Sequence, residues 1–410
     1  MRKLFLCMLV LFSIIISGCT EEKDNRIVNV NTRNWDNIVD SSKGTIVNLY
    51  TYIDKEEFIT YVDKYIKPNL KTEHDITLRL IIDDYVDIID RLENYKATED
   101  ENGEMDLIWV EGSKINEFIS KDYVFGPYTN QLPNMEIYLD NNKYENSMYY
   151  GMDLMDSFLP FGRSQMVLFY NEEIVDEAPL SVDQLMTYVK SNNGKFSYPE
   201  AKSKLGREFI NTVIINEIGE RAILSLSGKE SDEEILNVIK PGIDVLKEMN
   251  PYLWNQGQGY PLDEKELIDL YIAGEINMAM SSDQFFVENN ELDDFPGDTY
   301  SFVFDKGTVS SYSYLCIPYN SLNKSGAMVT ANYLLNPDAQ GIKYNPSNWG
   351  NLPVIDPSRL NDSEFKKMKK IRIKKYSIDY TEFYTKSIPN IPKELDLKIA
   401  KIWYNEVYKK

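Results

Sequence analysis

Apolar and polar residues alternate along the chain with two different periods, which predict strands and helices in turn. In the first part, β-branched runs predict strands, and apolar residues spaced three or four apart predict helices. These segments are, in chain order, a strand at residues 45–50, a helix at 56–66, a strand at 76–82, a helix at 85–95 and a strand at 106–110. The first helix is expected to stop at Pro68, because proline lacks the backbone donor that a helix interior needs. This order favours an α/β fold in which helices cover largely parallel strands.

The alternation restarts after Gly151, and the restart predicts a second lobe. The predicted segments are strands at 166–170, 276–280 and 311–318 and helices at 182–190, 207–217, 234–249, 263–273, 325–335 and 393–408. Residues 97–104 are acidic and have no apolar period, so they predict an exposed loop.

The amino end has the pattern of a secretory signal peptide. Two basic residues, Arg2 and Lys3, precede an unbroken apolar run that is shorter than the roughly 20 residues of a membrane-spanning helix. The run ends in Ile-Ser-Gly-Cys at residues 16–19, which resembles a lipobox. We therefore expect residues 1–18 to be a lipoprotein signal peptide and Cys19 to carry a lipid.

Residues 19–34 are polar and without periodicity, so they predict a flexible tether. The domain from about Trp35 onward is then expected at the extracytoplasmic face of the cell membrane, facing the periplasm if the cell has two membranes. Of the three cysteines, Cys7 leaves with the signal and Cys19 is the lipid site. Cys316 remains, in an apolar run, and predicts a buried small hydrophobic residue without a disulfide.

The net charge of −21 is strongly acidic and argues against nucleic acid as a partner, since such a surface repels phosphates. With this acidic charge, the lipid rather than a basic patch is expected to hold the protein at the membrane. It weakly favours a cationic or neutral solute over a polyanion.

Several short strings, in collinear order from about Trp35 to the carboxyl end, resemble an extracellular solute-binding protein of bacterial ABC importers, close to family 1 and to a thiamine-type or uncharacterised branch. The strings are DLIWVEG at 106–112, FGP at 125–127, LPN at 132–134, FGRSQ at 161–165, GKFSYP at 194–199, PYLW at 251–254, IPYN at 317–320, KSGAM at 324–328 and ANYLL at 331–335. One departure is Tyr52-Ile53-Asp54, where the family has Trp-Gly-Gly after the first strand.

The resemblance implies a type II periplasmic-binding fold, with two α/β lobes joined by strand crossovers around a ligand cleft. Lobe 1 would comprise residues 35–165 and 305–345, and lobe 2 residues 166–304 and 346–410. The chain would cross between them near residues 163–168, 300–306 and 344–349. It also implies a monomeric, non-enzymatic receptor without a cofactor, which hands a small-molecule solute to an ABC permease and its ATPase.

Ligands of open α/β sheets bind beyond the carboxyl ends of the strands, so residues just after strands are the candidates for binding. The candidate ligand-binding residues are Tyr52, Asp54, Trp109, Glu111, Gly112, Phe161, Arg163, Gln165, Ser281, Ser282, Asp283 and Tyr312. Trp109 fits either a core or a cleft. Arg163 is expected to bond an acid across the hinge, or otherwise an anionic ligand group. Aromatic faces beside carboxylates favour a small polar or cationic solute, with carbohydrate as the second choice.

Other classes of function have weaker support. The one histidine, His74, predicts a surface loop, and no Gly-x-Ser-x-Gly string marks a hydrolase. Tyrosine pairs, Tyr149 with Tyr150 and Tyr312 with Tyr314, would be the candidates for ferric iron. Asp83-Asp84 and Asp293-Asp294 predict solvated loop acids rather than glycosidase acids. A secreted hydrolase or a sensor lipoprotein on a similar scaffold stays an alternative.

Overall fold

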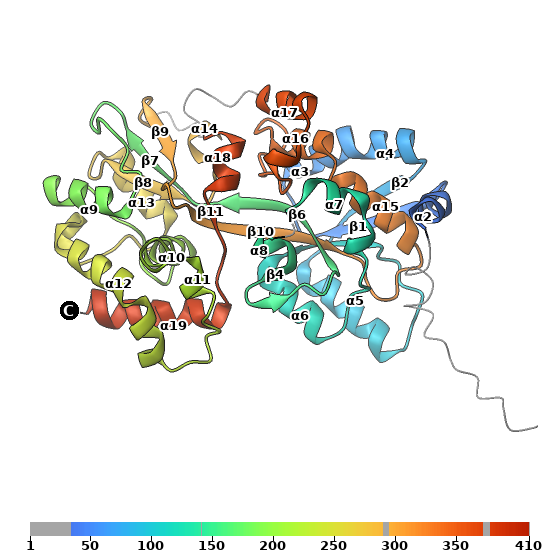
Figure 1. Cartoon of the computed structure of the whole chain (residues 1–410), viewed down its shortest axis with the longest axis horizontal. Coiled ribbons are helices and arrows are strands. Elements are labelled where there is room, and N and C mark those ends of the chain that lie inside the picture. The colour runs from blue at the N-terminus through green and yellow to red at the C-terminus, as the bar shows by residue number, and fades with distance from the viewer. Residues whose placement is uncertain (1–33, 141, 290–294, 372–377, 410) are drawn as a thin grey trace, which may run out of the picture.

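The computed structural model describes residues 34–140, 142–289, 295–371 and 378–409. The signal peptide, Cys19 and the tether up to residue 33 lie outside these residues, as does the pair at 293–294. Figure 1 shows two lobes side by side, with β6 and β10 running from one to the other. In the part of the chain that the structure describes, no helix is long and apolar enough to cross a membrane.

Lobe 1 is built on a mixed sheet of six strands in the order β11, β10, β3, β1, β2, with β6 paired to β10. The strands are β1 (Ile46–Thr51), β2 (Thr77–Ile82), β3 (Leu107–Glu111), β6 (Phe158–Gln165), β10 (Thr308–Cys316) and β11 (Ser387–Ile388). β1 pairs in parallel with β2 and β3, whereas β10 is antiparallel to β3 and β6. Four successive residues of β3 are buried because both faces of the sheet are covered.

Helices cover both faces of this sheet (Figure 1). They are α2 (Trp35–Ser42), α3 (Glu56–Tyr61), α4 (Lys67–His74), α5 (Tyr85–Ala97), α6 (Ile115–Ser120), α7 (Pro133–Tyr138), α8 (Tyr144–Ser147), α15 (Lys324–Leu334) and α16 (Pro337–Tyr344). A short hairpin, β4 (Met148–Tyr149) and β5 (Met152–Asp153), projects beside α8. Cys316 is fully buried and free, which confirms its predicted role as a small core residue.

Lobe 2 has a three-stranded sheet in the order β8, β7, β9, packed among longer helices. Its elements are β7 (Val167–Asn171), α9 (Val182–Ser191), α10 (Lys204–Ile218), α11 (Glu220–Ile223), α12 (Asp232–Met249), α13 (Glu264–Ile272), β8 (Met278–Ser281), α14 (Phe286–Asn289), β9 (Thr299–Phe302) and α19 (Lys393–Trp403). A π-helical turn, Tyr404–Tyr408, extends α19. The start of α12 is fixed by a capping box, in which Ser231 and Glu234 satisfy each other's backbone N–H groups.

Each lobe has its own hydrophobic core, and β10 takes part in both. Val309, at its beginning, belongs to the lobe 2 core, and Tyr312, three residues on, belongs to the lobe 1 core. A third, smaller core lies between them and contains Val167, Phe285 and Tyr344. It also takes in the last crossover, with α17 (Asp362–Lys369) and α18 (Tyr380–Thr385). We call β6, β10 and the described residues from α16 to β11 (337–371 and 378–388), which connect the two lobes, the hinge.

Three predictions about local structure are wrong. The sheets are not largely parallel, because β7 pairs antiparallel with both β8 and β9 and β10 reverses against β3. The helix after β1 does not stop at Pro68. A π-helical turn, Val62–Ile66, carries the chain into α4, with Pro68 in the first turn of α4, where a missing donor costs little. His74 ends α4 rather than lying in a loop, and its ring meets Tyr333 edge-on, with centroids 5.7 Å apart.

Candidate ligand cleft

A cleft of about 1240 Å³ lies between the two lobes and ends on the hinge strands. Its lining comes from β3 and the β4–β5 hairpin of lobe 1, from α10 and the start of α19 in lobe 2, and from β6 and β10 between them. A rotation of one lobe relative to the other would change every distance across this cleft.

The lobe 1 wall begins where β3 ends. Trp109 and Glu111 line the cleft, followed by Gly112 at the start of a short 3₁₀ turn. Tyr52 supports this wall from behind, with its ring edge-on to Trp109 at 5.1 Å. Its hydroxyl accepts the backbone N–H of Glu111 at 3.0 Å. The strand end is thereby held in a fixed orientation toward the cleft.

Tyr149 fixes the hairpin to the hinge. Its buried hydroxyl accepts the backbone N–H of Tyr312 at 2.8 Å and the side-chain amide of Asn390 at 3.4 Å. The ring lies directly against Gly112, where a Cβ atom would sit 1.8 Å from Tyr149 Cε1. Glycine at this position therefore allows the tyrosine to pack against the backbone of the β3 turn.

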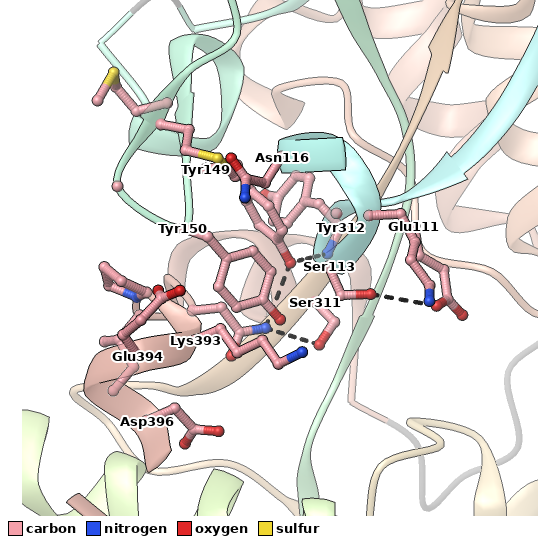
Figure 2. A pocket seen from close by; sticks show the side chains of 18 of the residues that line it. Glu111, Ser113, Asn116, Tyr149, Tyr150, Ser311, Tyr312, Lys393, Glu394 and Asp396 are labelled. Carbon is pink, nitrogen blue, oxygen red and sulfur yellow. Dashed lines mark hydrogen bonds between the residues drawn. The ribbon is translucent and has the colours of Figure 1, made fainter. Parts of the chain in front are cut away.

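Tyr150 projects from the hairpin into the cleft. Its φ angle of 50° is in the left-handed region, which costs a residue with a side chain about 1 kcal/mol or more. Its ring meets the Tyr149 ring at 4.5 Å in an edge-to-face arrangement. Figure 2 shows it between Tyr149 and the first turn of α19. Burial, then Tyr149 and then Asp396 of lobe 2 raise the pKa of the Tyr150 phenol, which stays protonated and able to donate a hydrogen bond.

The floor of the cleft is formed by hydroxyl and amide groups of the hinge, among them Ser164, Ser311, Ser313, Asn351 and Asn390. Asn390 donates its amide to the Ser310 carbonyl at 3.0 Å and to Ser311 Oγ at 2.9 Å, as Figure 2 shows for Ser311. These two hydrogen bonds connect β10 to the residues that lead into α19. A floor of this composition offers both donors and acceptors to a polar solute.

The lobe 2 wall carries paired charges. Arg207 of α10 and Asp396 of α19 form an ion pair at 2.7 Å, and Asn211 donates to the same carboxylate at 2.8 Å. Glu208 accepts the hydroxyl of Ser282 at 2.6 Å, and Lys204 lies 3.5 Å from it. The whole lining holds six basic and five acidic side chains, so the cleft is nearly neutral although the chain is strongly acidic.

Five buried polar atoms of the lining have no hydrogen-bond partner among the described residues. They are Trp109 Nε1, Arg163 Nη2, Asn211 Oδ1, Tyr312 OH and Asn351 Oδ1. A buried polar group without a partner costs about 1–3 kcal/mol, so each of these atoms is an open hydrogen-bonding position in the lining. Both lobes and the hinge contribute to this set.

The structure brings five of the sequence candidates to the cleft: Trp109, Glu111, Gly112, Arg163 and Tyr312. Of the others, Tyr52 stands behind the wall and Asp54 is exposed outside the lining. Phe161 is buried in the lobe 1 core, against Trp349.

Four further candidates lie away from the lining. Gln165 is buried in the hinge and donates to Thr308 Oγ1 and to the Lys386 carbonyl. Ser281 donates to Glu264, and Ser282 bonds the cleft residue Glu208 from behind. Asp283 is exposed and accepts the backbone N–H of Phe285 two residues on.

The expectation that Arg163 bonds an acid across the hinge is wrong. Its Nε donates to the Pro353 carbonyl at 2.8 Å and its Nη1 to the Phe383 carbonyl at 3.1 Å. These carbonyls belong to the last crossover, so the arginine joins two hinge segments through their backbones. A guanidinium with several donors in one plane suits this role, because it can satisfy carbonyls from two segments at once.

Sequence reasoning missed most of the lobe 2 wall and the role of the hairpin. Arg207 and Asp396 lie in the first turns of α10 and α19, and Asn211 lies at the middle of α10, whereas the sequence candidates are residues at strand ends. On the sequence alone, Tyr149 and Tyr150 are candidates only as iron ligands. Burial raises the pKa of both phenols, as it does for Tyr312 and Tyr314.

The acids Asp83 and Asp84 lie outside the cleft lining. Asp83 pairs with Arg91 at 3.2 Å, and Asp84 is the residue before α5. Within the described ranges, no group of three or more histidines, cysteines, aspartates or glutamates is arranged to hold a metal ion.

Two α/β lobes, strand crossovers and a cleft between them define a periplasmic-binding-type fold. The chain belongs to the bacterial extracellular solute-binding protein family, whose model matches residues 61–372. Both the predicted family and the predicted fold class are thereby confirmed. The family is that of extracellular solute-binding proteins, and the fold is that of periplasmic binding proteins.

Individual relatives are distant. Protein YnjB of Escherichia coli K12 is 25% identical over 333 residues, which are 80% of this chain and 84% of YnjB. The maltose-binding protein MalE of Listeria monocytogenes, solved with maltose, is 16% identical with a TM-score of 0.64, over 89% of this chain and 97% of MalE. The cyclic α-maltosyl-1,6-maltose binding protein of Arthrobacter globiformis is 11% identical with a TM-score of 0.66, over 88% of this chain and 94% of that protein. At these identities the solved structures show the fold alone.

Proposed function

We propose that this protein is the lipid-anchored substrate-binding component of an ABC importer, which captures a small solute in the interlobe cleft and delivers it, as a monomer, to a membrane permease. The observation that carries the proposal is the cleft itself, whose walls come from both lobes and whose floor is the hinge. The five unpartnered polar atoms on these surfaces supply hydrogen-bonding positions for a solute.

We propose a small polar or cationic solute. Trp109 and Tyr150 offer aromatic faces on one side, and Glu208 and Asp396 offer carboxylates on the other. A cation over an aromatic face gains about 0.5–2 kcal/mol, depending on desolvation. Carbohydrate is the second candidate, favoured by the hydroxyl and amide floor and by the near neutrality of the lining.

Replacing Trp109 by alanine is expected to weaken solute binding by about tenfold or more, because an aromatic wall and an indole N–H donor are lost together. Solutes are first found by thermal shift against sugars, polyamines and other small cations, and affinities are then measured by calorimetry. Trp254→Ala, outside the lining in lobe 2, is the matched control. Asp283→Asn is expected to retain binding, since that carboxylate caps its own turn.

Full affinity in Trp109→Ala for every solute that binds the native protein would place the site elsewhere. The same titrations in rising sodium chloride separate the two solute classes. Affinity for a cation falls as salt screens the carboxylates, whereas affinity for a neutral sugar changes little.

Lipid attachment at Cys19 is tested by metabolic labelling with a fatty-acid analogue. We expect label on the native protein and none on Cys19→Ser, with Cys7→Ser as the matched control that keeps the label. A Cys19→Ser protein that still carries label would refute the proposed anchor and leave the binding function untouched.

A further inference from the structure

A group of polar side chains meets on the hinge beside the floor of the cleft. Arg163 of β6 and Tyr312 of β10 are cross-strand partners, Tyr384 comes from α18, and Lys143 precedes α8. We call these four residues the hinge cluster. The Arg163 guanidinium lies 5.3 Å from the centre of the Tyr384 ring and the Lys143 ammonium 4.7 Å from it. Four segments distant in sequence thus converge on one point.

Three donors of the hinge cluster have no hydrogen-bond partner in the part of the chain that the structure describes. They are Arg163 Nη2, Tyr312 OH and Tyr384 OH. Each side chain is more than nine-tenths buried, with exposed fractions of 1%, 3% and 8%. Burial is the main cause that raises the pKa of both phenols, so at neutral pH both keep the proton that they can donate.

The hinge cluster holds two cations, Arg163 and Lys143, and the acids Glu145, Asp140 and Asp356 act on it. Within the described residues neither cation forms an ion pair, and Arg163 bonds only carbonyl groups. Lys143 donates instead to Ser387 Oγ at 2.9 Å. Glu145 is a buried acid that acts on Tyr312 and Lys143, and it offsets one of the two cations. Asp356, which acts on Tyr384, lies 3.8 Å from Arg359.

Arg163 acts on two neighbouring lysines. Burial first, and the charge of Arg163 in addition, lowers the pKa of Lys343, which donates to the Phe161 carbonyl. Burial lowers the pKa of Lys143, and Glu145, which acts more strongly on Lys143 than Arg163 does, opposes that shift. An anion placed among the three donors would satisfy all three groups and would pair with Arg163.

We propose that the hinge cluster binds a small monovalent anion of halide size, held by Arg163 Nη2 and the hydroxyls of Tyr312 and Tyr384. A buried charge is stabilised when it is both paired and hydrogen-bonded, and an anion at this point does both for Arg163. Since Arg163 also bonds the carbonyls of the last crossover, the anion would fasten three hinge segments to one another. Arg163 and Tyr312 also line the cleft, so the anion would take two of the five unpartnered atoms of the lining and leave Trp109 Nε1, Asn211 Oδ1 and Asn351 Oδ1 to a solute.

The test compares thermal unfolding of the purified protein in sodium chloride and in sodium gluconate at equal ionic strength. We expect a melting temperature about 2–5 °C higher in chloride. Tyr384→Phe keeps the ring and removes one donor, and at least half of the chloride shift should be lost. Tyr61→Phe is the matched control, since Tyr61 carries an equally buried hydroxyl without a partner in the lobe 1 core. It should keep the full shift.

Crystals grown in sodium bromide locate the ion directly. An anomalous peak within hydrogen-bonding distance of Arg163 Nη2 and both hydroxyls, together with the chloride shift, supports the proposal. Equal melting temperatures in the two salts, an unchanged shift in Tyr384→Phe, or water alone at the hinge cluster would overturn it. A bromide peak without any chloride-dependent shift would mean an adventitious ion only, and it would overturn the proposal as well.

Discussion

Replacing Arg163 by methionine is expected to lower the free energy of unfolding by about 2–4 kcal/mol. Methionine keeps much of the apolar volume but removes two hydrogen bonds from a charged donor, each worth about 1.5–3 kcal/mol. The carbonyls of Pro353 and Phe383 would be left buried without their donor. Because burying the guanidinium itself costs free energy, the net loss is smaller than the sum of the two bonds.

Urea denaturation followed by tryptophan fluorescence measures this loss. The matched control is Arg91→Met, which removes a half-exposed arginine from surface pairs with Asp83 and Glu104. Exposed ion pairs are worth about 0–1 kcal/mol, so the control should remain close to the native protein. If both variants lost the same small amount, Arg163 would not be holding the crossovers together.

Replacing Gly112 by alanine is expected to weaken solute binding by about tenfold or more and to lower stability by about 1–3 kcal/mol. The new methyl group would overlap the Tyr149 ring, whose nearest atom is 1.8 Å from the Cβ position. Tyr149 must then move, and its hydroxyl would lose the backbone N–H of Tyr312. Tyr150 moves with it, because the two residues are adjacent in the hairpin.

Calorimetric titration with a solute found in the thermal-shift screen measures the affinity, and urea denaturation measures the stability. Gly297→Ala is the matched control, because a Cβ there meets nothing within 4 Å. Native affinity in Gly112→Ala would show that the hairpin adjusts without consequence and that Tyr149 does not position the cleft wall.

The sequence determined the class of fold to a large extent. Apolar periodicity located most helices and strands to within a few residues, such as α12 and β3, because a buried face must be apolar at the period of its element. It could not determine strand direction, because parallel and antiparallel strands that are buried on both faces have the same apolar runs. It also failed at Pro68, where a π turn changes the hydrogen-bond register just before the proline.

Reasoning from the sequence found only part of the candidate site. Strand-end logic found Trp109, Glu111 and Gly112 because β3 opens directly into the cleft. The same logic selected Gln165 and Ser281, which point into the hinge and toward α13 instead. Whether a residue after a strand faces the cleft depends on how the lobes meet, and short stretches of sequence contain no information about this.

By itself, therefore, the sequence determined where the helices and strands form and which apolar faces they bury, since both are local consequences of residue type. The tertiary structure alone decided the partners of buried polar groups. Arg163 finds carbonyls 190 and 220 positions away, and Tyr149 finds a backbone N–H 163 positions away. Hydrogen bonds require contact within about 3 Å, and over such separations only the packing of the two lobes determines which groups come that close.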